Sequence, residues 1–74
     1  CYLMELSVDD KIAIVNQHLK TIVGNLYNLN VSLILEQAVE PINEEAVNNI
    51  NNLIKKEMLK KDALINELDI LKNG

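Results

Sequence analysis

The sequence predicts an all-α protein: an antiparallel two-helix hairpin that dimerises into a four-helix bundle with coiled-coil-like packing. Apolar residues recur in alternating steps of four and three through the first half of the chain, which keeps one side of a long helix apolar. A second apolar stripe follows Pro41, and the two predicted helices have nearly equal lengths. With 74 residues, the chain is expected to form a single domain, 1–74.

The first predicted helix spans about residues 8–39. Ser7 is suited to the N-cap position, and Asp9 and Asp10 place negative charge at the positive end of the helix dipole. Because the residue before a proline disfavours helical geometry, Pro41 predicts a stop near Val39. The apolar seam of this helix consists of Val8, Ile12, Val15, Leu19, Ile22, Leu26, Leu29 and Leu33.

A turn is expected at about 40–43 and a second helix at about 44–72. Asn43 is a good N-cap, followed by Glu44 and Glu45 in the first turn. The second stripe has a gap at Glu57 and Lys61, and its apolar members are Val47, Ile50, Ile54, Leu64, Leu68 and Leu71. The alternative to a hairpin is one continuous helix kinked at Pro41.

A hairpin whose turn centres near Ile42 fixes which residues lie at the same height. Both helices rise equally per residue, so the numbers of facing residues should sum to about 84. Ile34 is then expected near Ile50, and Tyr27 near Glu57. This register predicts that Tyr27 covers the polar gap in the second stripe.

Both stripes are predicted to serve self-association. Short chains rarely bury a sufficient core alone, and a lone Cys1 excludes an internal disulfide. Beyond Leu33 the apolar residues change side, and a further apolar line flanks the seam, so each helix needs more than one neighbour. These additional residues are Val31, Leu35, Ala38 and Ile42, with Val23, Tyr27 and Ile34 on the flanking line. A homodimer is expected, and a tetramer stays open.

No residue set indicates catalysis, so we expect no enzyme activity, no cofactor and no metal site. His18 is interpreted as an interface-edge residue, since no carboxylate stands three residues before it. Glu36 and Glu40 are expected on a solvated face. Asn48, Asn49, Asn51 and Asn52 predict an exposed polar face, with a buried, register-fixing asparagine as the alternative.

Two other function classes have a basis in the second helix. Lys55, Lys56, Lys60 and Lys61 form a basic cluster, in which Glu57 is spaced to pair with Lys61. A nucleic-acid-binding regulator could use the face formed by Lys55, Lys56 and Lys60. Leu68, Asp69 and Leu71 resemble part of the Ser-x-x-Leu-Asp-x-Leu motif of the small two-helix sporulation-phosphatase family. That resemblance implies a phosphatase-like regulator using Asp69, but Ile65 stands where the family has serine.

Composition favours the interaction-protein interpretation. The net charge of −4 argues against a dedicated nucleic-acid or membrane-surface binder. Residues 1–6 lack a signal-peptide pattern, with Met4 a candidate start, so a soluble cytoplasmic protein is expected. Abundant asparagine, isoleucine and lysine without arginine is typical of AT-rich genomes. We therefore expect a self-associating structural or interaction protein, an assembly or adaptor component of a viral or bacterial complex whose protein partner the sequence does not identify.

Overall fold

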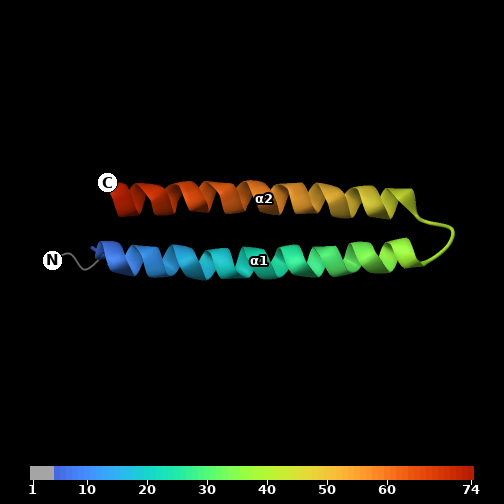
Figure 1. Ribbon diagram of the computed structural model, residues 1–74, viewed down its shortest axis with the longest axis horizontal. Helices are drawn as coiled ribbons and strands as arrows, with labels where there is room; N and C mark the ends of the chain where they lie inside the picture. The colour runs from blue at the N-terminus through green and yellow to red at the C-terminus, as the bar shows by residue number, and fades with distance from the viewer. Residues whose placement is uncertain (1–4) are drawn as a thin grey trace.

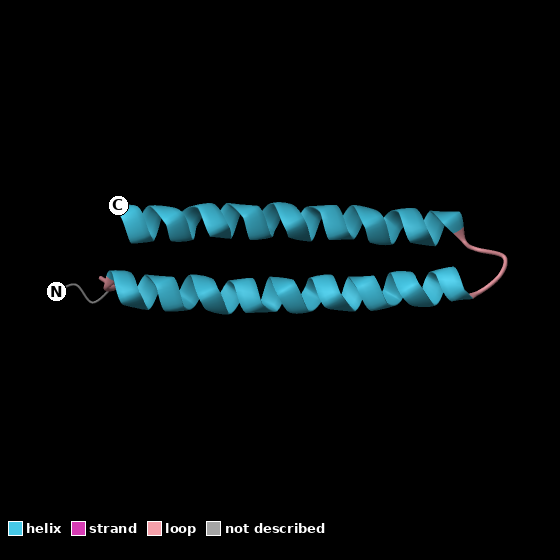
Figure 2. Cartoon of the chain, in the orientation of Figure 1, coloured by secondary structure: helices cyan, strands magenta, loops and turns pink. Residues whose placement is uncertain are grey.

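Two long helices lying side by side make up the computed structural model, which describes residues 5–74 (Figure 1). Helix α1 spans Val8–Ala38 and helix α2 spans Glu44–Asn73. They run in opposite directions and are joined by one loop, and the described part of the chain contains no strand (Figure 2). Cys1 and the candidate start at Met4 lie outside the described residues. The hairpin is thus formed, rather than the continuous kinked helix.

Both helices begin at the residues that the capping pattern indicates. The backbone N–H of Asp10 donates to Ser7 Oγ at 3.1 Å. At the second helix, the backbone N–H of Ala46 donates to Asn43 Oδ1, also at 3.1 Å. These bonds satisfy backbone donors that the first turn of a helix leaves without partners. The polar caps therefore fix where each helix starts.

The loop between the helices is centred on Pro41. Helix α1 ends at Ala38, one residue before the predicted stop, because Val39 already has extended backbone angles (φ −102°, ψ 134°). Residues 39–43 form the connection, and α2 begins at Glu44. The middle of this five-residue loop is one position earlier than the sequence interpretation placed it, which alters the register of the hairpin.

The core is a single seam between the two helices. Almost every apolar residue of the two predicted stripes is half-buried there, and Ile22, at mid-seam and 8% exposed, is the one buried residue among residues 5–74. Val8 is the exception, since it begins α1 and is exposed. The structure therefore brings the residues predicted for self-association together within one chain.

The seam continues through polar positions that the sequence interpretation excluded from it. Glu36 is half-buried and keeps the alternating spacing of α1 beyond Leu33, so its assignment to a solvated face is wrong. Glu57 and Lys61 are half-buried at the gap in α2. Leu35 is exposed instead. A straight helix keeps its contact face regardless of which residues occupy it, so geometry overrides composition at these positions.

The molecule is one layer thick. Its principal dimensions are 60 × 18 × 16 Å, and its radius of gyration is 17.2 Å, against about 11 Å for a compact domain of this length. Its accessible surface is 5932 Å², whereas a compact monomer of 8.4 kDa exposes roughly 4,600 Å². A hairpin of this shape leaves the outer sides of both helices without cover.

Candidate interaction surface

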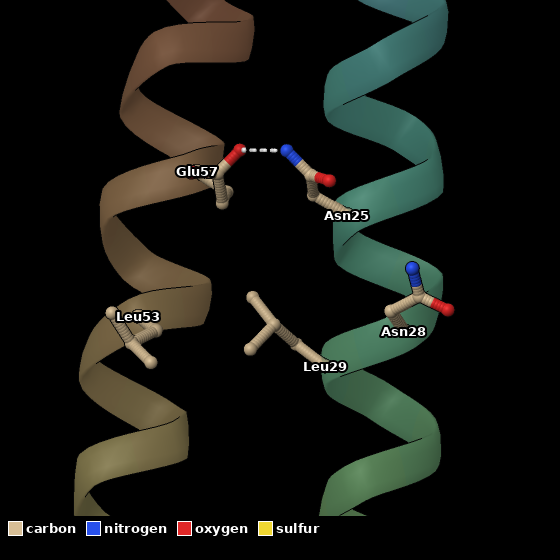
Figure 3. A pocket seen from close by; sticks show the side chains of 5 residues that line it. All are labelled: Asn25, Asn28, Leu29, Leu53 and Glu57. Atoms are coloured by element: carbon tan, nitrogen blue, oxygen red, sulfur yellow. Dashed lines mark hydrogen bonds between the residues drawn. The ribbon is translucent and has the colours of Figure 1, made fainter.

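A polar cluster at mid-height links the two helices. Asn25 Nδ2 on α1 donates to Glu57 Oε1 on α2 at 3.3 Å (Figure 3). Lys60 Nζ donates to Glu57 Oε2 at 3.0 Å, one turn further along α2. The Glu57 side chain is 15% exposed, whereas that of Lys60 is 64% exposed. Glu57 thus occupies a seam position with both carboxylate oxygens satisfied.

The same bonds favour the charged form of Glu57. Hydrogen bonds from Lys60 and then Asn25, together with the positive charge of Lys60, hold the pKa of Glu57 below its ordinary value of 4.5. Partial removal from water opposes this shift. The carboxylate is therefore ionised at neutral pH, and the expected partner at Lys61 is replaced by Lys60 at i+3.

Facing residues define a register that differs from the expected one. Asn25 lies opposite Glu57, and Leu29 lies opposite Leu53 (Figure 3). Both pairs of numbers sum to 82, in agreement with a loop centred on Pro41 rather than Ile42. The placement of Tyr27 over Glu57 is consequently wrong: Tyr27 is 68% exposed, and Asn25 bonds the carboxylate instead.

A shallow, open recess lies beside the polar cluster, with a volume of about 280 Å³ (Figure 3). Its lining combines the two leucines with two amides and one carboxylate: Leu29, Leu53, Asn25, Asn28 and Glu57. It marks one side of the hairpin, which we call the recess face. The volume is at the lower limit of small-molecule sites, and much of the lining is open to solvent.

The opposite side of the hairpin has a different character. At about 100° per residue, Val23 and Tyr27 flank the α1 seam on the side away from Asn25 and Asn28. Met58 similarly flanks the α2 seam on the side away from Leu53. We call this side the open face, and its large exposed apolar residues are Val23, Tyr27, Ile34, Met58 and Ile65. Their exposed fractions range from 47% to 68%.

The lysine cluster is divided among different environments. Lys60 is bonded to Glu57, and Lys61 is half-buried in the seam, where its aliphatic stem can pack on apolar neighbours. Lys55 and Lys56 are exposed. The four lysines therefore do not form one free basic surface.

The remaining candidate residues occupy simple surface positions. His18 lines a small depression with Gln17 and Thr21 on α1. The Asp69 carboxylate accepts a hydrogen bond from Asn73 Nδ2 at 2.6 Å, near the end of α2. The four helix-two asparagines predicted on a polar face are exposed. Within residues 5–74, no group of three or more His, Cys, Asp or Glu side chains is arranged to hold a metal ion.

Asn25 is the residue that the sequence interpretation did not single out. It lies directly beside the α1 seam, at the height of the gap in the α2 stripe. If the numbers of facing residues sum to 82, Asn25 faces Glu57, whereas a sum of 84 places Tyr27 opposite Glu57. The spacing of the two stripes therefore contains the pairing of Asn25 with Glu57, but it predicts this pair only when the centre of the turn is known.

Over residues 5–74, neither helix combines the length and apolar character needed to cross a membrane. The chain matches no protein-family model, and it has no detectable similarity to the curated proteins or the solved structures compared with it.

Proposed function

We propose that this protein is a small interaction module whose hairpins self-associate into a four-helix bundle and act as an assembly or adaptor component. One observation supports the proposal most: 49% of the residues are hydrophobic, yet Ile22 is the sole buried apolar residue in the described part of the chain, and no side chain there is fully buried. Burying such surface is the main favourable term in both folding and association. The proposal assigns no catalytic step to the protein.

A second hairpin would supply the neighbours that one hairpin lacks. In a four-helix bundle each helix packs against two others, so side chains flanking the seam become part of a shared core. The surface excess over a compact monomer, roughly 1,300 Å², is comparable to the area that each partner contributes to a substantial dimer interface. A homodimer is the smallest assembly that provides this cover, and a tetramer would extend it.

Light scattering coupled to size exclusion tests the proposal directly. At micromolar concentration we expect a particle of twice the 8.4 kDa chain mass, or four times that mass for a tetramer, with strongly helical circular dichroism. Dilution should lower the melting temperature, because association and folding are linked. A well-folded, monodisperse particle of 8.4 kDa across this range would contradict self-association.

A binding experiment with nucleic acids distinguishes the interaction module from a nucleic-acid-binding regulator. Mixed RNA and DNA oligonucleotides should bind no more tightly than roughly millimolar at physiological salt, because the lysines are few and Lys60 is paired with Glu57. Micromolar binding with a steep salt dependence, lost in a Lys55→Glu and Lys60→Glu variant, would replace the interaction-module proposal with a nucleic-acid-binding regulator.

A further inference from the structure

We infer that the second copy docks on the open face, the surface formed by Val23, Tyr27 and Ile34 of α1 with Met58 and Ile65 of α2. This inference rests on the proposed self-association and names the surface that performs it. The other candidate surfaces are the recess face and the outer edges of the hairpin. The area of the open face is sufficient for a dimer, and the charge and the position of the apolar residues beside the seam favour this face.

The open face is large enough for a stable dimer. The hairpin measures 60 by 18 Å across its two broad sides, and a standard protein interface buries about 800 Å² per partner. Tyr27 and Val23 are 68% and 52% exposed at the centre of α1, so most of their apolar area is still available. Aromatic residues and methionine are also enriched in interfaces, which fits Tyr27 and Met58.

Charge distinguishes the two broad sides of the hairpin. The positions that directly flank the seam on the open face are uncharged over most of its length: Asn16, Val23, Asn30, Gln37, Asn51, Met58 and Ile65. On the recess face, the corresponding positions include Lys60 and Glu67, and the Glu57 carboxylate borders the recess. Covering charged groups without new partners is costly, so the positions directly beside the seam are less costly to desolvate on the open face. The outer row of this face carries Lys20, Lys55, Asp62 and Asp69 and is expected to form the solvated rim of the interface.

Val23 and Met58 lie at the middle of the hairpin, where the centre of a symmetric dimer interface is expected. Val23 is the midpoint of α1 (Val8–Ala38), and Met58 is adjacent to the midpoint of α2 (Glu44–Asn73). Their numbers sum to 81, so they are nearly level across the hairpin. A two-fold axis that lies in the interface and passes through this level brings four apolar side chains, two from each copy, into one central layer. Central apolar residues contribute most to binding.

Paired substitutions test this assignment against a matched control. We expect a Val23→Glu and Met58→Glu variant to dimerise on the order of 100-fold more weakly, because it places unpaired charges in the interface. The control is Leu35→Glu with Leu59→Glu, which changes two residues of comparable exposure, 62% and 69%, about half a helical turn from the seam. This control should retain the wild-type dissociation constant, measured by analytical ultracentrifugation.

Charge complementation keeps the test informative if the glutamate variant unfolds alone. A Val23→Lys and Met58→Lys variant, mixed with the glutamate variant, should recover a helical dimer containing one copy of each. Wild-type dimerisation by the glutamate variant, failure of the mixture to associate, or dissociation of the control alone would overturn the open-face assignment. A monomeric wild-type protein would instead overturn the proposed function itself.

Discussion

Glu57 shows how a charged residue is accommodated in an apolar seam. Its carboxylate accepts one hydrogen bond from Asn25 across the hairpin and one from Lys60 along its own helix. Neither donor is buried, so the charge stays close to water while the side chain fills a seam position. The cross-helix bond also specifies which residues of α1 and α2 lie level, a role that polar seam residues have in coiled coils.

Glu57 predicts a specific pH dependence of stability. Because its pKa is lower in the folded state than the ordinary 4.5, ionised Glu57 stabilises the fold at neutral pH. This contribution is lost as pH falls below 4.5 and through the folded-state pKa. Glu57→Gln should therefore reduce the unfolding free energy near pH 7, and its deficit relative to wild type should shrink in acid. Glu67→Gln on the exposed surface of α2 is the control, and chemical denaturation at several pH values is the measurement.

Gly24 offers a stabilising substitution. A Cβ added there meets no atom within 4 Å, and its φ is not positive, so neither close packing nor backbone geometry requires glycine. Gly24→Ala should raise the unfolding free energy by about 0.8–1.0 kcal/mol, because alanine loses less backbone entropy in a helix. Ala63→Gly, at an exposed position of α2, should have the opposite effect. Destabilisation by Gly24→Ala would instead reveal a close approach by another molecule.

At the scale of the helices, polar caps and heptad spacing have separate roles. Ser7 and Asn43 determine where the helices begin, through hydrogen bonds to backbone N–H groups. The heptad spacing determines which side of each helix faces the other. Helices of 31 and 30 residues have enough repeats for a continuous seam. Polar residues interrupt the apolar seam at Glu36 in α1 and at Glu57 and Lys61 in α2.

The Asn43 cap can be tested with a matched asparagine. Asn43→Ala should lower the unfolding free energy by about 1 kcal/mol, because the N–H of Ala46 loses its acceptor, whereas Asn43→Asp should retain the cap. Asn49→Ala makes the same chemical change inside α2, where asparagine is exposed, and should stabilise by a few tenths of a kcal/mol. Thermal unfolding followed by circular dichroism at one fixed protein concentration measures these changes. Equal effects of the two alanine variants would argue against the cap.

At the scale of the whole molecule, loop length sets the pairing of residues on the two helices. A loop centred on Pro41 makes level residues sum to about 82, as Asn25 and Glu57 do. Leu33 and Ile50, both half-buried, have numbers that sum to 83 and are therefore expected to lie close to one another across the seam. Ile34 is 57% exposed on the open face, which argues against the expected approach of Ile34 to Ile50.

Disulfide formation tests this register. In a Cys1→Ser background, cysteines introduced by Leu33→Cys and Ile50→Cys should form a bond within one chain under mild oxidation. The pair Ile34→Cys and Ile50→Cys should do so far more slowly, because residue 34 points away from the seam. Non-reducing electrophoresis and mass spectrometry distinguish bonds within and between chains. If cysteines at positions 34 and 50 formed the disulfide preferentially, the numbers of facing residues would sum to about 84, as expected for a turn centred near Ile42.

The sequence by itself determined the two helices, their N-caps and, apart from Val8, the apolar residues of the seam. These features depend on neighbours within a few positions, as with Ser7 and Asp10, or on a short repeating period, as with Ile12 to Leu33. Local patterns of this kind can be identified in the sequence without a structure. They also identified Val23, Tyr27 and Ile34 as apolar residues left outside the main seam.

Only the tertiary structure decided the register, the partner of Glu57 and the burial of Glu36. The register and the partner of Glu57 depend on how far the loop carries the chain between helices, and a shift of the loop centre from Ile42 to Pro41 moves every facing pair. Glu36 is half-buried because a straight helix keeps its contact face beyond Leu33. The structure also separated the recess face from the open face, because the two sides differ only once α1 and α2 are aligned. Helical periodicity fixes the direction of a side chain about its own axis, whereas its neighbour on the other helix depends on the turn.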